Sequence, residues 1–83
     1  LVLAAARGPC WLGVHVGTSA GRLVHEGMLA QGGSLHFAAR RLWIRLGAPQ
    51  NLDASLNGRP ATLPDDTANV VVTTAGIRTV ALG

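Results

Sequence analysis

Apolar and polar residues alternate along most of the chain with a period of two. In residues 42–46, Leu42, Ile44 and Leu46 fall on one face, and Trp43 and Arg45 fall on the other. Successive side chains of a β-strand point to opposite sides of its sheet, so this spacing predicts a strand with one buried face. Turn-forming residues interrupt the alternation at spacings of about 8–12 residues, which is typical of an all-β domain.

Nine segments of the chain are predicted to be strands. Only the residues near Ala38 and Ala39 favour a helix by propensity. The alternation of apolar and polar residues that follows them favours a strand. The strongest turn signal is Asn57-Gly58, because both residues tolerate the positive φ of a type I′ hairpin. The nine segments are residues 1–6, 10–16, 22–30, 35–39, 42–46, 52–56, 60–63, 70–74 and 77–82.

The alternation also assigns the faces of the strands. In residues 42–46 the Leu and Ile side chains must face the core, because the opposite choice would bury Arg45 and the preceding Arg41 unpaired, which costs more free energy than exposing Trp43. The same reasoning turns Trp11 and His15 outward and leaves an aliphatic core. The residues expected to face inward are Cys10, Leu12, Val14, Val16, Leu35, Phe37, Leu42, Ile44, Leu46, Leu52, Ala54 and Leu56.

Composition limits the class of protein. The chain has 83 residues, 48% of them hydrophobic and 13% charged, which fits one folded domain over residues 1–83 and excludes a disordered chain. The longest stretch without Arg, Asp or Glu is residues 8–21, shorter than the ~20 apolar residues of a membrane-spanning helix. The lone Cys10 allows no intrachain disulfide and no cysteine-based zinc site.

The excess of basic over acidic residues does not predict nucleic-acid binding. The net charge is +3, and all seven basic residues are arginine. Only Arg40, Arg41 and Arg45 lie close together in the sequence, whereas a nucleic-acid binder gathers its charge along one stripe.

Catalytic and metal-binding motifs are not apparent. His15, His25 and His36 have spacings that match no zinc motif, so a hydrolase that uses them is the last of the alternatives. The adjacent Asp65 and Asp66 follow a proline and indicate a solvated turn rather than a catalytic pair. We therefore expect that the protein is not an enzyme and that it binds no cofactor.

The row Arg41, Trp43 and Arg45 is the strongest candidate binding surface, and Trp11, with His15 as its same-face neighbour, is a further candidate. Guanidinium groups can stack on an indole from same-face positions of a strand, and Trp and Arg are enriched at interface hot spots. Two interpretations remain open from the sequence. Either these tryptophans form an interface, or they are covered locally by loops and arginine stems.

Several motifs, taken in order, resemble the C-terminal extracytoplasmic domain of RodZ-type bacterial cell-shape proteins. The most specific motif is a Leu-Asn-Gly-basic-Pro hairpin. The matching segments are Leu1-Val2-Leu3, Cys10-Trp11-Leu12-Gly13-Val14, Gly21-Arg22-Leu23-Val24, Gly27-Met28-Leu29, Gly32-Gly33 with Phe37, Leu42-Trp43-Ile44-Arg45-Leu46-Gly47, Leu56-Asn57-Gly58-Arg59-Pro60 and Ile77-Arg78-Thr79-Val80.

This resemblance implies a small β-sandwich, loosely immunoglobulin-like, with about seven antiparallel strands. It also implies a domain excised from a longer single-pass protein of the cell membrane, anchored by a segment outside this chain and facing the extracytoplasmic side. Its expected role is non-enzymatic contact with cell-wall synthesis or cell-shape membrane proteins, through Trp11, Arg41, Trp43 and Arg45.

A carbohydrate-binding β-sandwich is the alternative function. Sugar rings of peptidoglycan would stack on Trp11 and Trp43, and Arg45 and Asp53 would hold their polar groups. No nucleic-acid partner is expected for this domain.

Overall fold

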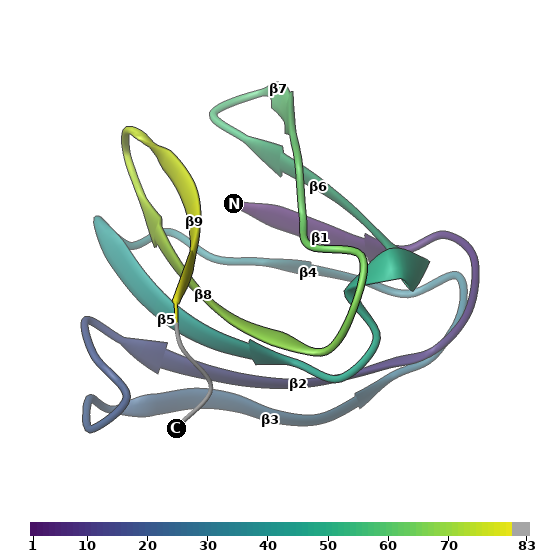
Figure 1. The fold of residues 1–83 in the computed structure, drawn as a ribbon, viewed down its shortest axis with the longest axis horizontal. Coiled ribbons are helices and arrows are strands. Elements are labelled where there is room, and N and C mark those ends of the chain that lie inside the picture. The colour runs from purple at the N-terminus through teal and green to yellow at the C-terminus, as the bar shows by residue number, and fades with distance from the viewer. Residues whose placement is uncertain (81–83) are drawn as a thin grey trace.

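The computed structural model describes residues 1–80 and shows two antiparallel sheets packed face to face (Figure 1). The all-β prediction is confirmed, but the described residues form nine strands rather than about seven. The strands are β1 (Val2–Ala5), β2 (Cys10–Val16), β3 (Leu23–Leu29), β4 (Ser34–His36), β5 (Arg41–Leu46), β6 (Leu52–Leu56), β7 (Arg59–Ala61), β8 (Ala68–Thr73) and β9 (Gly76–Val80).

One sheet has four strands in the order β4-β1-β6-β7, and the other has five in the order β3-β2-β5-β8-β9. The chain crosses between the sheets after β1, after β3, before β5, before β6 and after β7. Before β6, the crossing is a short 3₁₀ turn, Pro49–Asn51, which begins at a proline and ends where Leu52 becomes extended. Consecutive segments of the sequence therefore often lie in different sheets.

Each predicted segment overlaps an observed strand, but segments 35–39 and 60–63 extend past the ends of β4 and β7 and were predicted too long. Residues 10–16 and 52–56 are strands with the predicted ends, and the last two residues of segment 77–82 lie outside the described residues. The count of seven was wrong because β4 and β7, three residues each, still pair along the two edges of the four-stranded sheet. Asn57 and Gly58 have φ values of 54° and 79°, which confirms the positive-φ hairpin turn between β6 and β7.

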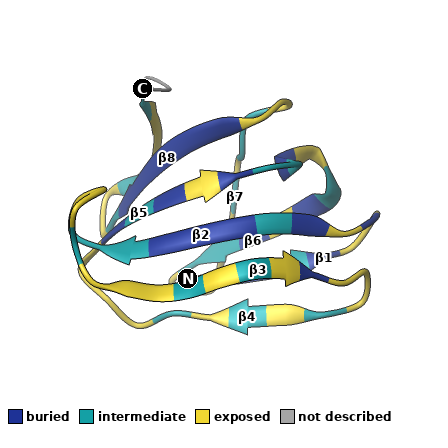
Figure 2. Ribbon diagram, turned by 90° about the horizontal axis from the view of Figure 1, so that it is seen from below, coloured by how far each residue is buried: buried dark blue, intermediate teal, exposed yellow. Residues whose placement is uncertain are grey.

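The core lies between the sheets and is aliphatic. Leu12, Val14, Ile44, Leu46 and Val70 are almost completely buried. Figure 2 shows the buried positions concentrated on β2, β5 and β8, the three inner strands of the five-stranded sheet. The predicted inward set is confirmed, with Val16, Leu35, Phe37 and Leu56 half-buried and packed against the rest. Among residues 1–80 there is no helix of the length and hydrophobicity needed to cross a membrane.

Candidate functional site

The side of the five-stranded sheet that faces away from the core carries most of the predicted site residues. The pairing of β2 with β5 sets His15 beside Trp43 and Gly13 beside Arg45. Glu26 and Met28 of β3 adjoin Gly13 and Trp11 on the other side. We call this surface the outer face, and its residues are Trp11, Gly13, His15, Glu26, Met28, Arg41, Trp43, Arg45, Val71 and Arg78.

Trp11 lies along the sheet rather than projecting from it. A β-carbon at Gly13 would be 3.0 Å from Cη2 of the indole, so the ring occupies the space that the glycine leaves open. Gly47 approaches Trp11 from β5, and its N–H donates to the Trp11 carbonyl oxygen at 2.9 Å. Gly13 thus leaves room for the half-buried indole, and Gly47 binds the backbone of the same residue.

Trp43 contacts the imidazole of His15. The two ring centroids are 5.5 Å apart with an interplanar angle of 70°, an edge-to-face arrangement. Nδ1 of His15 donates to the carbonyl oxygen of Gly21 at 3.0 Å, which fixes the orientation of the imidazole.

The two arginines beside Trp43 bind polar acceptors. Nε of Arg41 donates to the Gly17 carbonyl oxygen at 3.0 Å, and Nε of Arg45 donates to Oδ1 of the buried Asn69 at 3.2 Å. Both arginines remain exposed. The row expected from the sequence is therefore present as a surface, with its guanidinium groups fixed at the two ends of the row.

A hollow of about 270 Å³ opens in the outer face. Its lining combines Gly13 with two indoles, an imidazole, a carboxylate, a guanidinium and a hydroxyl group. These groups offer aromatic rings for stacking and both donors and acceptors for hydrogen bonds. Such a combination suits a polar ring of the size of a sugar. The lining residues are Trp11, Gly13, His15, Ser19, Glu26, Trp43 and Arg45.

Gly13, Ser19 and Glu26 were not among the predicted site residues. The alternation in residues 10–16 does turn Gly13 outward between Trp11 and His15, so the gap beneath an indole could have been noticed from the sequence. Glu26 reaches the site only through the register of β3 against β2, which pairs it with Gly13. No local signal in the sequence gives that register.

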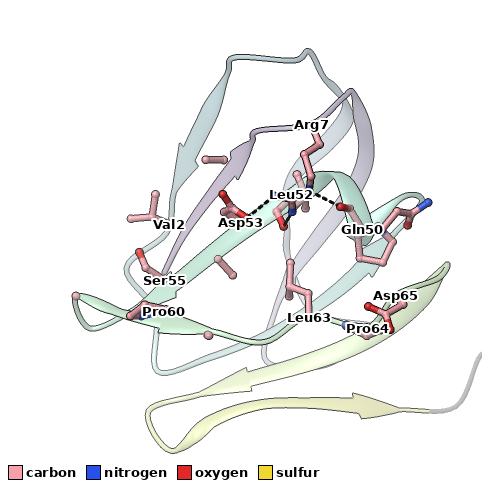
Figure 3. Close-up of a pocket in the computed structure, with 15 residues that line it drawn as sticks. Val2, Arg7, Gln50, Leu52, Asp53, Ser55, Pro60, Leu63, Pro64 and Asp65 are labelled. Atoms are coloured by element: carbon pink, nitrogen blue, oxygen red, sulfur yellow. Dashed lines mark hydrogen bonds and ion pairs between the residues drawn. The ribbon is translucent and has the colours of Figure 1, made fainter.

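Asp53 does not belong to this surface. It lies on β6 in the four-stranded sheet, where its carboxylate accepts a hydrogen bond from Arg7 Nη1 at 2.8 Å (Figure 3). Arg7 also donates to the carbonyl oxygens of Gln50 and Leu52. Grouping Asp53 with the tryptophans was wrong, because the 3₁₀ turn carries β6 out of the sheet that holds β5.

Arg7 and Asp53 line a separate groove of about 640 Å³ on the four-stranded sheet. Small side chains, including Ala4 and Ser55, line the groove and leave it open. Leu63 and Pro64, in the segment that leads to β8, line one side of it (Figure 3). The groove and the outer face belong to different sheets, so a single small ligand cannot contact both.

Residues 3–74 match the family described as the RodZ C-terminal domain. The chain belongs to this family. A comparison with curated proteins and with solved structures finds no match. Membership confirms the resemblance noted in the sequence motifs, and the extracytoplasmic location remains a prediction.

The three histidines of this RodZ-type domain are dispersed. His15 lies on the outer face, His36 is exposed on β4, and His25 pairs with the core residue Val14. Nε2 of His25 is buried without a hydrogen-bond partner among residues 1–80. Within the same described residues, no group of three or more His, Cys, Asp or Glu side chains is placed to hold a metal ion.

Cys10 is part of the core of the RodZ-type domain. Its thiol is buried, and its sulfur accepts a hydrogen bond from the Ala48 N–H at 3.4 Å. Burial raises the pKa of the Cys10 thiol, and the weaker opposing effect comes from the backbone N–H groups of Ala48 and Gly47. The thiol therefore packs as a small apolar group, as the sequence predicted, and not as a nucleophile.

Proposed function

We propose that this domain is a non-enzymatic protein-interaction module of a RodZ-like membrane protein. It would contact cell-wall synthesis or cell-shape membrane proteins on the extracytoplasmic side through the outer face. The observation that carries the proposal is that half-buried Trp11 and Trp43 and exposed Arg41 and Arg45 share one face of the five-stranded sheet. Tryptophan and arginine are the side chains that most often dominate the binding energy of protein interfaces.

The charges of the outer face indicate the chemistry of the partner. Arg41, Arg45 and Arg78 stand on β5 and β9, whereas Glu26 on β3 is the acidic residue of this face. A complementary partner would present acidic side chains toward β5 and β9 and an apolar pocket toward the indoles. Such complementarity fixes the orientation of the partner and speeds association.

The test is capture of wall-synthesis membrane proteins from detergent-solubilised membranes by the full-length protein, followed by direct titration of each captured protein after purification. We expect Trp43→Ala to weaken the titrated affinity by roughly 30-fold, the effect of a hot-spot residue. Arg45→Glu should also weaken it. His36→Ala, on the opposite sheet, is the matched control and should leave the affinity unchanged.

Circular dichroism and thermal unfolding of each variant separate loss of contact from loss of fold. Full affinity for the captured proteins in both Trp43→Ala and Trp11→Ala would refute the assignment of the outer face.

Carbohydrate binding is the second candidate function, and the hollow over Gly13 favours it. Trp11 and Trp43 would stack against a sugar ring, and Glu26 and Arg45 would bind its polar groups, with Glu26 in the role first assigned to Asp53. Titration with soluble peptidoglycan fragments should shift the tryptophan emission to the blue. Glu26→Gln and Trp43→Ala should abolish that shift, and Asp53→Asn should preserve it. No shift at millimolar fragment concentrations would exclude this function.

A further inference from the structure

The four edges of the two sheets are not equally protected against pairing with another strand. β4 and β7 have three residues each, and β7 contains Pro60, which has no backbone N–H. β9 carries the charged Arg78. Short length, proline and charge are the usual features that prevent an edge strand from pairing with a foreign chain.

β3 also carries a charge, Glu26, and an irregular register at Val24, but it is longer than the other three edge strands and more apolar on its exposed side. It has seven residues, and all the exposed large hydrophobic side chains of the described chain belong to it: Leu23, Val24 and Met28, with Met28 63% exposed. Figure 2 shows β3 exposed along most of its length, in contrast to the buried β2 beside it. β2 is its partner within the sheet, so the opposite edge of β3 faces away from the sheet.

The local geometry of β3 favours the approach of a further strand. Pairing with β2 is regular from His25 to Leu29, and the register shift lies before it, where Val24 is the extra residue between Leu23 and His25. Gly27 stands in the middle of the regular part with a φ of 144° and no side chain. A glycine inside a strand is a common mark of a place where another backbone comes close.

We propose that β3 binds an extended strand of a protein partner, which becomes a sixth strand of the five-stranded sheet. Main-chain hydrogen bonds would supply the affinity, and the side chains of β3 would select the sequence of the partner.

Glu26 defines the chemistry of that partner strand. Its carboxylate forms no ion pair within residues 1–80 and lies at the centre of the exposed strand, two residues from Met28 and from Val24. A strand with Lys or Arg opposite Glu26 would neutralise this charge, and its residues two positions away on either side would lie opposite Met28 and Val24. The preferred partner is therefore a strand of the form apolar-x-basic-x-apolar, in either direction.

A second copy of this chain fits β3 poorly. Symmetric antiparallel pairing about Glu26 would set two carboxylates opposite each other, and like charges at opposed positions destabilise a sheet. Symmetric pairing about Gly27 would set each Glu26 opposite a Met28 side chain instead. The charge of Glu26 thus disfavours self-association at this edge.

This inference rests on the proposed function only because it assumes a protein partner. It uses the backbone of β3 rather than the indoles of the outer face.

The probe is a fluorescently labelled peptide, Thr-Val-Thr-Lys-Thr-Val-Thr. Its binding is measured by the fluorescence anisotropy of the peptide as the protein is added. A peptide with Glu in place of Lys is the matched control. We expect the Lys peptide to bind at least about tenfold more tightly, and Glu26→Lys to reverse the preference.

Two further peptides test the binding mode. Each carries backbone N-methyl groups on alternate residues, so that each blocks one edge of the extended strand. One of the two should lose binding, and the other should retain it. Amide hydrogen exchange should slow in β3 on binding, and Trp43→Ala should leave peptide affinity unchanged. Arg59→Glu, on β7 of the other sheet, should have no effect.

Several results would overturn the inference: no binding of the Lys peptide, binding that tolerates both N-methylated peptides, or amide protection on β5 in place of β3. Dimerisation of the unliganded protein in analytical ultracentrifugation that Glu26→Lys disrupts would assign the edge to a second copy instead. Loss of native-partner affinity in Trp43→Ala with peptide binding intact would support both proposals, because it separates the outer face from the edge.

Discussion

The indole of Trp11 and the backbone of Gly13 are in contact, and a β-carbon at position 13 would come within 3.0 Å of Cη2 of the ring. If the indole keeps its position, Gly13→Ala should destabilise the fold by about 1 kcal/mol, the lower end of the usual effect of overpacking. If the indole moves instead, its emission should shift to the red. Urea unfolding and fluorescence spectra measure the two effects.

The control for this prediction is the same substitution made in a Trp11→Ala background. Without the indole, alanine at position 13 should be neutral or stabilising, because alanine loses less backbone entropy on folding than glycine. Equal destabilisation in both backgrounds would mean that the contact with Trp11 is not the cause.

His25 should be replaceable by an apolar residue. Its Nε2 is buried without a hydrogen-bond partner, and such an atom costs about 1–3 kcal/mol of desolvation free energy. His25→Leu should raise the free energy of unfolding by about 1 kcal/mol. His36→Leu, on exposed β4, should change it by less than about 0.5 kcal/mol. A large loss of stability in His25→Leu would show that the imidazole makes a favourable interaction.

Cys10 makes the free energy of unfolding depend on pH in the alkaline range. Burial raises the pKa of its thiol, so above the ordinary thiol pKa of about 8.5 the unfolded chain releases a proton that the folded chain retains. The contribution of Cys10 to stability is therefore complete below that pH and declines as the pH rises toward the folded-state pKa.

Urea unfolding of the wild type and of Cys10→Ala between pH 7 and pH 10 measures this effect. The difference between the two free energies of unfolding should shrink above about pH 8.5. A thiol-specific reagent should modify the folded protein far more slowly than the unfolded one. A difference that does not vary with pH would contradict the assignment.

The hairpin turn between β6 and β7 depends on backbone conformation alone. Gly58 has a φ of 79°, and a β-carbon there would meet no atom within 4 Å. Gly58→Ala should cost about 1–2 kcal/mol through the left-handed conformation, with no steric contribution. Asn57→Gly, at φ 54°, should have little effect. An unchanged midpoint of urea unfolding in Gly58→Ala would mean that the turn changes type.

Local pattern located the strands, although it placed the ends of the two short strands β4 and β7 incorrectly. Residues 10–16 and 52–56 carry strict alternation between turn residues, and their strand bounds were predicted without error. The alternation also turned Trp11 and Trp43 outward. Both properties follow from a period of two and from the cost of burying arginine, which depend only on near neighbours in the sequence.

The assembly of the site depended on pairings that no local pattern contains. Asp53 follows β5 closely in the sequence yet lies in the other sheet, and Glu26 is distant in the sequence yet adjoins Gly13. His15 replaced the arginines as the ring partner of Trp43 because β2 and β5 are neighbours in the sheet. The order and register of strands are set by packing of the whole domain.

The strand order β4-β1-β6-β7 has a kinetic consequence. β1 is the first strand of the chain, yet its partners are β4 and β6, and Val2 pairs with Ser55. Such distant pairings require closure of long loops before they add stability, which places sandwiches of this kind among domains that fold in milliseconds to seconds. A chain that emerges from its N-terminus must therefore hold β1 unpaired until β4 (Ser34–His36) has followed, and the other edge of β1 stays open until β6 (Leu52–Leu56) is present.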